Sequence, residues 1–379
     1  MIRKVAVFTS NRAELGLLSP IVTKIENSKL LELQLIIAGT NLRDEQSISD
    51  IEKLNISTTY CIDYLDGNHS DKASEISKIL SSISIFYKEY KPDILLVLGD
   101  RYELIPVVFM ASFYRIPIFH MYGGETSEGA IDESVRHSVT KFSHVHLVAN
   151  EIHKKRIIQL GENSNNIYVV GSMGIENAMN IAIWPRERII EELGFKENCK
   201  NYLVTYHPAT LNPDEQGMEA ISSLVENETN SFFLFSAANP DPGGDLINQK
   251  IQEICNRYPE KTRFIANLGV EKYINAVRNS NAVIGNSSSG LIEVSALKVP
   301  TINIGIRQRG RLAADSVISC NASYLDISKA MKTIENESFK MKLQNVTCPY
   351  GDGNTSNQII DILCQFNLDN ILIKKFHDK

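Results

Sequence analysis

The chain has 379 residues, which is too long for one ordinary domain, so two domains of under about 200 residues each are expected. Apolar residues make up 43% and charged residues 22%, proportions typical of a globular protein with sizeable cores. The formal net charge of −6 argues against a nucleic-acid partner, because binding to a phosphate backbone needs clustered Lys and Arg.

The cysteines and the N-terminus indicate where the protein works. Six cysteines are scattered without a CxxC pair or a His spacing that suggests zinc, so reduced thiols and no metal are expected. The segment 1–8 runs directly into a β-like pattern whose apolar run is too short for a signal peptide. No later stretch approaches the length of a membrane span. We therefore expect a cytoplasmic protein without a membrane partner.

Short apolar runs alternate with longer helical patterns along the first half, as in parallel βα units. The predicted strands are Val5–Thr9, Leu33–Ala38, Ile94–Leu98, Ile116–His120, Val145–Val148 and Ile167–Val170. Most are near-continuous apolar runs, as expected of strands covered by helices on both faces. A predicted helix over 71–90 ends at Lys91-Pro92, because Pro cannot continue it.

The pattern restarts after Gly171, and Trp184-Pro185 is typical of a connection into a second unit. There the predicted strands are Tyr202–Tyr206, Phe232–Phe235, Phe264–Ala266, Ala282–Ile284 and Thr301–Ile304. This rhythm predicts an α/β protein with two Rossmann-like, doubly wound domains and a ligand site in the cleft between them. We expect domains at 1–178 and 179–355, and a C-terminal helix within 356–379 that packs back on the first.

Charged residues stand at the carboxyl ends of the first-half strands, where α/β sheets place functional groups. Arg12 lies at the turn after the first strand, in place of the glycines of a dinucleotide-binding loop, and there it either grips a phosphate or is an ordinary surface Arg. Asp100 follows Gly99 at the end of another strand and either acts in catalysis or caps the helix that starts near Glu103.

The next strand leads into a loop rich in carboxylates, His120-Met121-Tyr122-Gly123-Gly124-Glu125 and then Gly129 to His137. Paired glycines allow the backbone to approach a ligand closely. Asp132 opens a predicted helix and can be a cap, while Glu133 and His137 are four residues apart and can be a surface pair. The concentration of carboxylates near Asp100 favours an active site.

The second half carries the strongest motif, Asn286-Ser287-Ser288-Ser289-Gly290 followed by Glu293. A strand stops at small residues and a helix is predicted to begin there, with free amides and hydroxyls that suit a diphosphate, or serve as a Ser-rich N-cap. Glu293 suits a ribose diol. His207, at the end of an earlier strand, is either structural or directed at the site. Three Arg within 307–311 can neutralise a diphosphate.

Taken together, these motifs resemble the UDP-N-acetylglucosamine 2-epimerase family, in the hydrolysing branch that opens sialic and related nonulosonic acid pathways. The resemblance spans nearly the whole chain, and it implies a GT-B-like fold, a homodimer, and no metal or nicotinamide cofactor. It further implies conversion of UDP-GlcNAc to ManNAc and UDP. Because the C2 proton is not beside a carbonyl, its removal is coupled to departure of UDP from C1, which gives a 2-acetamidoglucal that is then hydrated.

The resemblance also implies roles for individual residues. Asp100 and Asp132 match the catalytic carboxylates, with Glu125, Tyr122 and Glu133 as further candidates. The matches to UDP-sugar contacts are Arg12, Arg101, His207, Asn239, Asn286, Ser287, Ser288, Ser289, Glu293 and Arg307.

One position departs from the family. Many members carry a catalytic Glu two residues after the motif His, and here that residue is Tyr122. Either Glu125 supplies the carboxylate, or Tyr122 donates a proton, or the substrate differs, for instance UDP-2,4-diacetamido-2,4,6-trideoxyglucose as in legionaminic acid synthesis. A non-hydrolysing epimerase, a GT-B glycosyltransferase and an inactive nucleotide-sugar sensor are the remaining alternatives.

Overall fold

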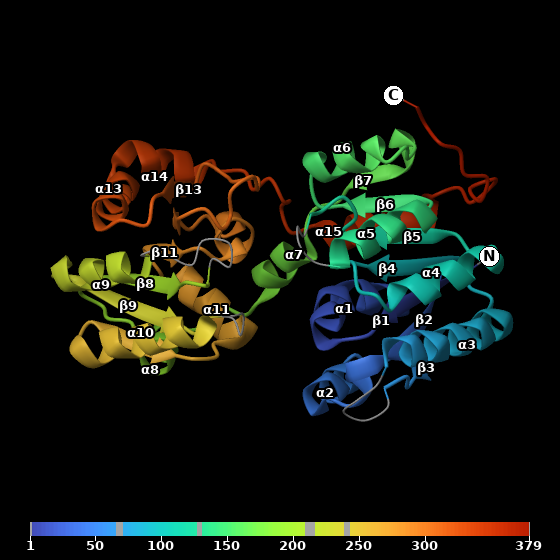
Figure 1. Cartoon of the computed structure of the whole chain (residues 1–379), viewed down its shortest axis with the longest axis horizontal. Helices are drawn as coiled ribbons and strands as arrows, with labels where there is room; N and C mark the ends of the chain where they lie inside the picture. The colour runs from blue at the N-terminus through green and yellow to red at the C-terminus, as the bar shows by residue number, and fades with distance from the viewer. Residues whose placement is uncertain (1, 66–70, 127–130, 209–216, 239–242, 379) are drawn as a thin grey trace. The chain divides into compact units, whose positions relative to one another are not determined.

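The computed structural model describes residues 2–65, 71–126, 131–208, 217–238 and 243–378. The chain forms two compact units, and each is described by itself (Figure 1). Unit 1 comprises Met1–Met173 together with Asn354–Lys379, and unit 2 comprises Gly174–Gly353.

Unit 1 contains a seven-stranded parallel sheet in the order β3-β2-β1-β4-β5-β6-β7. Its strands are β1 Arg3–Thr9, β2 Leu31–Ala38, β3 Thr59–Ile62, β4 Ile94–Leu98, β5 Ile118–Met121, β6 Val145–Val148 and β7 Ile167–Val169. Its helices are α1 Arg12–Glu26, α2 Glu45–Lys53, α3 Lys72–Tyr90, α4 Leu104–Phe113, α5 Ile131–Phe142, α6 Glu151–Gln159 and α15 Thr355–Gln365, with short 3-10 helices at Gly39–Leu42 and Ser164–Asn166. Helix α7 Met173–Asn180 begins at the last residue of this segment, and its other residues belong to unit 2.

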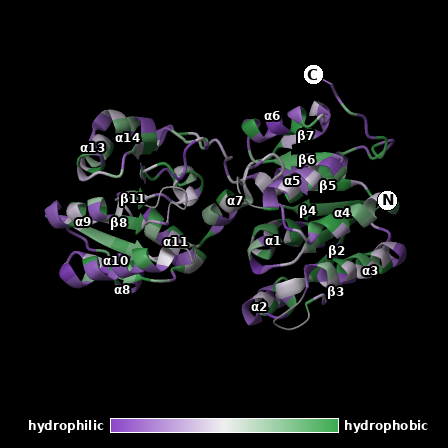
Figure 2. Cartoon of the chain, viewed as in Figure 1, coloured by the Kyte–Doolittle hydropathy of each residue, from purple (hydrophilic) through white to green (hydrophobic). Residues whose placement is uncertain are grey.

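Both faces of this sheet are buried, as the continuous apolar runs predict. Successive residues of a strand point to opposite faces, so Val5 and Val7 join the cluster with α1 and α15, while Ala6 and Phe8 join the cluster with α3, α4 and α5. Figure 2 shows the consequence, with hydrophobic strands inside helices of mixed polarity.

The C-terminal helix belongs to unit 1. Ile359 and Leu363 of α15 are fully buried in the cluster that also holds α1. Lys24 of α1 donates hydrogen bonds to Ser356 Oγ, at 2.6 Å, and to Asn357 Oδ1.

Unit 2 contains a six-stranded parallel sheet in the order β10-β9-β8-β11-β12-β13. Its strands are β8 Lys200–Thr205, β9 Ser231–Ser236, β10 Thr262–Ile265, β11 Ala282–Gly285, β12 Thr301–Ile304 and β13 Val317–Cys320. Its helices are α8 Arg186–Leu193, α9 Gly217–Asn227, α10 Gly244–Arg257, α11 Gly269–Arg278, α12 Glu293–Ala296, α13 Tyr324–Glu335 and α14 Glu337–Gln344, with a 3-10 helix η3 at Ser288–Gly290.

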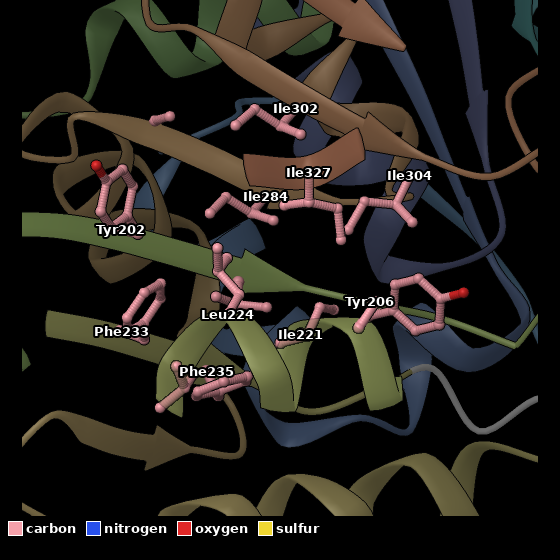
Figure 3. Packing of buried hydrophobic residues seen from close by; sticks show 14 of the residues in the cluster. Tyr202, Tyr206, Ile221, Leu224, Phe233, Phe235, Ile284, Ile302, Ile304 and Ile327 are labelled. Carbon is pink, nitrogen blue, oxygen red and sulfur yellow. The ribbon is translucent and has the colours of Figure 1, made fainter. Parts of the chain in front are cut away.

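The larger core of unit 2 lies between this sheet and α9, α10 and α13 (Figure 3). The rings of Tyr202 and Phe233, on neighbouring strands, stack with their centroids 5.4 Å apart. Trp184, the only tryptophan of the sequence, is buried in the smaller core on the other face, where Arg188 lies 3.8 Å from its ring centroid.

The prediction of an α/β protein with two doubly wound parallel sheets is confirmed. Two edge strands, β3 and β13, were not predicted, because their residues are mostly half-buried or exposed and form no long apolar run. The strand predicted at 116–120 is displaced, since Pro117 has no amide to donate and the ladder starts at Ile118. No helix in the part of the chain that the structure describes is long and apolar enough to cross a membrane.

Candidate active site

A buried arginine gathers the candidate carboxylates of unit 1. Asp100 follows β4, and its carboxylate forms an ion pair with Arg136, whose side chain is 3% exposed. The same guanidinium donates to Glu133 Oε2 at 3.0 Å. Burial lowers the pKa of Arg136 to about 10, so the group remains a cation at neutral pH. One cation thus fixes Asp100 and Glu133 together at the carboxyl edge of the sheet.

Helix α5 positions this group. Asp132 and Glu133 lie in its first turn, and Arg136 follows Glu133 by three residues, so both side chains lie on one helix face. Glu133 Oε1 also contacts His137 Nε2 at 3.1 Å. The structure therefore places Asp100 and Glu133 on one guanidinium, from two elements, and Asp132 beside Glu133 in the first turn of α5.

His120 supports the loop that carries Asp100. Its Nε2 lies 2.7 Å from the carbonyl oxygen of Gly99, and its Nδ1 lies 3.3 Å from Thr140 Oγ1. Complete burial lowers the pKa of His120 to about 3, so the ring is neutral. A neutral ring that faces a carbonyl donates through Nε2 and accepts from the Thr140 hydroxyl at Nδ1. This motif histidine is a positioning residue.

The glycine pair turns the chain toward α6. Gly124 has φ +77°, and a Cβ there would collide with the backbone of His153, so only glycine fits. Its carbonyl accepts from Arg156 Nη1 at 3.0 Å. Glu125 follows, with Oε1 3.9 Å from His153 Nδ1.

Tyr122 has a backbone conformation that bulky residues rarely adopt, with φ +65°. Its hydroxyl accepts a hydrogen bond from the amide of Met173, at 2.8 Å, and lies 3.3 Å from Ser172 Oγ. The phenol therefore holds the first residue of α7. Strain of this kind concentrates at functional sites.

Arg101 lies beside two buried acids. It donates to Glu103 Oε1 at 2.7 Å, and Tyr64 donates to the same oxygen at 2.8 Å. Glu14 accepts from the amide and hydroxyl of Ser10, and burial raises its pKa.

Arg12, the first residue of α1, is exposed, and its Nε lies 3.5 Å from Asp50. Neither Asp100 nor Asp132 caps a helix by position, because α4 begins after Glu103 and Asp132 already lies inside α5.

Asn286 organises the candidate nucleotide site of unit 2. Its Oδ1 accepts from the amide of His207 at 2.7 Å, and its Nδ2 donates to the carbonyl of His207 at 2.8 Å. Its own carbonyl accepts from Arg307 Nη1 at 3.2 Å and from Gln308 Nε2 at 2.8 Å. Asn286 is completely buried, so it ties together the loops after β8, β11 and β12.

The serine segment differs from the predicted helix start. Ser288–Gly290 forms one 3-10 turn, and the α-helix that follows has only four residues. Ser287 Oγ accepts from the amide of Ser289, and the amides of Gly290 and Leu291 bond within the turn. A helix does begin at this point with Ser287 as its N-cap, but as a single 3-10 turn in place of the start of a long α-helix, and Thr301 and Ser295 donate to the Gly290 carbonyl.

Glu293 and a tyrosine complete this site. Burial raises the pKa of Glu293, against a hydrogen bond from Ser289 that lowers it. The hydroxyl of Tyr273, on α11, is buried near Ser289 and Glu293. Tyr273 was missed because no motif surrounds it; only the packing of α11 brings it here.

Arg307 belongs to this group through Asn286, while Arg309 and Arg311 are exposed. Asn239, another predicted contact, and Gly129 of the carboxylate loop lie outside the described residues. Among the residues that the structure describes, no three or more His, Cys, Asp or Glu side chains are grouped so that they could hold a metal ion.

Comparison with known proteins matches this arrangement to one family. A model of the UDP-N-acetylglucosamine 2-epimerase family matches residues 23–364. The chain is 38% identical to the GDP/UDP-N,N'-diacetylbacillosamine 2-epimerase (hydrolyzing) of Campylobacter jejuni, with 99% of each chain covered. It is 33% identical to the polysialic acid biosynthesis protein P7 of Escherichia coli, over 96% of this chain and 94% of that one.

A third relative, the UDP-N,N'-diacetylbacillosamine 2-epimerase (hydrolyzing) of Legionella pneumophila, is 31% identical over 99% of both chains. Among solved structures, the UDP-GlcNAc 2-epimerase of Neisseria meningitidis bound to UDP-GlcNAc superposes with a TM-score of 0.79 at 18% identity, over 96% of this chain and 99% of that one. This likeness confirms the expected two-domain GT-B-like fold.

Proposed function

The chain belongs to the UDP-N-acetylglucosamine 2-epimerase family, in its hydrolysing branch, and on that premise we propose that it converts UDP-2,4-diacetamido-2,4,6-trideoxyglucose to the free 2-epimeric sugar and UDP. The observation that carries the choice of sugar is that two relatives matched over 99% of this chain are named for N,N'-diacetylbacillosamine, which is this 2,4-diacetamido sugar. UDP-GlcNAc is the second candidate, favoured by the similarity to the polysialic acid protein.

The reaction proceeds in two steps. In the first, a base removes the C2 proton while the C1–O bond to UDP breaks, and the electron pair of C–H forms the C1–C2 double bond. In the second, water adds to this glycal, with hydroxyl going to C1 and a proton to C2 from the opposite face. The first step needs a base and a stabilised leaving group, and the second needs an acid.

Asp100 and Asp132 are the proposed base and acid. The support is their place at the carboxyl edge of the unit 1 sheet. There one nitrogen of the Arg136 guanidinium pairs with Asp100, and another pairs with Glu133. A base held by a buried cation keeps one orientation toward C2, which is the geometric requirement for proton transfer. Arg136 thus acts through Asp100 as a positioning residue.

The leaving group is assigned to unit 2. Ser287, Ser288 and Arg307 supply donors for the diphosphate, and Glu293 accepts from the ribose hydroxyls. Asn286 contributes indirectly, since both its Oδ1 and its Nδ2 are hydrogen-bonded to the backbone of His207.

Tyr122, at a position where many family members carry a catalytic Glu, adds support to a substrate other than UDP-GlcNAc. Its hydroxyl is engaged with Ser172 and Met173, and the residue thus resembles an anchor for the loop more than a proton donor. This leaves Glu125 as the candidate for a third carboxylate, next to His153.

The test is product analysis by NMR in heavy water, with three substrates offered separately: UDP-2,4-diacetamido-2,4,6-trideoxyglucose, its GDP analogue and UDP-GlcNAc. We expect the first to give free sugar with deuterium at C2 and UDP released in step. Release of an epimerised UDP-sugar would identify the non-hydrolysing reaction, and turnover only with an added acceptor would identify a glycosyltransferase.

Variants separate catalysis from binding. Asp100→Asn and Asp132→Asn should each lower kcat by at least about 100-fold, the contribution of a general acid or base, and leave UDP affinity within a factor of about two. Glu151→Gln, at the exposed start of α6, serves as the matched control. Full activity in both Asp variants would refute the assignment.

A cytoplasmic homodimer remains part of the proposal. Light scattering on the purified chain tests the dimer, and cell fractionation tests the location.

A further inference from the structure

Unit 1 contains a cavity of about 390 Å³ away from the carboxylate cluster. Three separate segments line it: Arg115 after α4, Lys141, Phe142 and His144 at the end of α5, and Leu372 and Lys374 of the C-terminal tail. Arg115 and His144 precede β5 and β6, whereas Asp100 and Tyr122 follow β4 and β5. Because the strands are parallel, the cavity and the carboxylates lie at opposite edges of the sheet. In Figure 1 the tail runs along the side where the N-terminus lies.

The lining is basic and includes no Asp or Glu. Lys141 and Lys374 both form ion pairs with Glu162, which is 3% exposed. Lys374 also donates to the carbonyls of Thr140 and Lys141 at the end of α5. Two lysines facing one carboxylate leave one positive charge uncompensated, and burial lowers the pKa of Lys374.

Arg115 adds a second uncompensated charge. Its side chain makes no hydrogen bond or ion pair with any residue in the described part of the chain, and the residue is exposed. Its backbone has φ +57°, a conformation that costs free energy for a residue of this kind. The turn therefore presents a guanidinium to the cavity rim that is unpaired as far as the described residues go.

His144 supplies a neutral donor. Its Nδ1 accepts from the amide of Ile118 at 3.1 Å, and burial lowers its pKa to about 4, so its proton is on Nε2. Phe142 and Leu372 contribute apolar surface to the same cavity. The lining thus combines cations, one neutral N–H donor and an apolar wall.

We propose that this cavity binds a small anionic molecule, a phosphate monoester or carboxylate with a compact apolar group, independently of the candidate active site. The anion pairs with Arg115 in the field of Lys141 and Lys374, and the apolar group lies against Phe142 and Leu372. A guanidinium is the side chain best suited to a planar or tetrahedral oxyanion. The cavity is of the size that small-ligand sites have.

The experiment uses the full chain saturated with UDP, so that the phosphate ligands cannot bind at the candidate nucleotide site of unit 2. Phenyl phosphate is titrated by calorimetry and by ligand-observed NMR, with inorganic phosphate and phenol as separate arms. We expect saturable binding of phenyl phosphate, weaker binding of inorganic phosphate, and none of phenol. Arg115→Asn should weaken phenyl phosphate roughly tenfold, the loss expected for one charge-assisted pair.

Asn is chosen because it tolerates positive φ, so the variant keeps the turn. Lys29→Asn removes one exposed positive charge elsewhere in unit 1 and should leave the affinity unchanged. The proposal is overturned if the UDP-saturated chain does not bind phenyl phosphate, if UDP competes with it, or if Arg115→Asn and Lys29→Asn have the same effect.

Discussion

Asn286→Ala tests whether the candidate nucleotide site depends on one buried amide. The substitution removes both side-chain hydrogen bonds to the backbone of His207, at 2.7 and 2.8 Å, and both are buried. The amide and the carbonyl of His207 thereby lose the partners that Asn286 supplies. Each buried group that loses its partner costs about 1–3 kcal/mol, so unit 2 should lose roughly 2–6 kcal/mol of unfolding free energy.

Urea unfolding followed by tryptophan fluorescence measures this loss, because Trp184 is the only tryptophan and is buried in a core of unit 2. UDP affinity should fall as well, since the Asn286 side chain joins the loop after β11 to the loop after β8. Asn321→Ala is the control: its amide bonds to Asp326 at the surface, and its effect should stay within about 0.5 kcal/mol.

Asn286→Asp refines the test. The carboxylate still accepts from the His207 amide but cannot donate to its carbonyl, so the variant should be destabilised. If the unfolding free energy of Asn286→Ala lies within about 0.5 kcal/mol of that of the unaltered chain, the reasoning from buried hydrogen-bond partners is refuted.

Three further predictions concern unit 1. Burial raises the pKa of Glu162, but hydrogen bonds from His146, Lys141 and Lys374 outweigh it and lower the pKa to about 2. The ionised carboxylate therefore stabilises the folded chain by about 3 kcal/mol above pH 4.5, and this contribution disappears as the pH falls toward 2. The difference in unfolding free energy between the unaltered chain and Glu162→Gln should narrow by roughly 1 kcal/mol between pH 6 and pH 3.5, and a constant difference would contradict this. In Gly124→Ala the new Cβ would sit on a residue with positive φ and would collide with the backbone of His153, so the variant should lose at least about 2 kcal/mol of unfolding free energy in urea. Gly269→Ala should lose less, because Gly269 also has positive φ but no atom lies close to its added Cβ. Tyr122→Phe removes the acceptor of the Met173 amide and should lower kcat less than about tenfold with an unchanged pH profile; a loss of about 100-fold with a displaced profile would instead assign proton donation to the phenol.

Much of the fold followed from local pattern. Continuous apolar runs such as 94–98 and 282–284 identify buried parallel strands, because only strands covered on both faces bury every residue. The same pattern could not identify β3 and β13, since edge strands bury few residues and carry no comparable run.

The sequence also placed the candidate site residues on the strands, though not their contacts. Functional groups of an α/β protein follow its strands, and the structure has Asp100, His207 and Ser287 after β4, β8 and β11, as the apolar runs predict. Spacing along α5 paired Glu133 with His137, as the structure shows, but it could not show that the guanidinium of Arg136 holds both Glu133 and Asp100, 36 residues before Arg136.

Only the tertiary structure showed which distant residues form hydrogen bonds with one another. Asn286 and His207 are 79 residues apart, and Lys374 lies 233 residues from the Lys141 carbonyl that it binds. Such contacts arise from the packing of whole elements, which no local pattern encodes. The serine motif shows the same limit: its composition favours a helix N-terminus, and the structure has a single 3-10 turn there, with Ser295 and Thr301 donating to the Gly290 carbonyl.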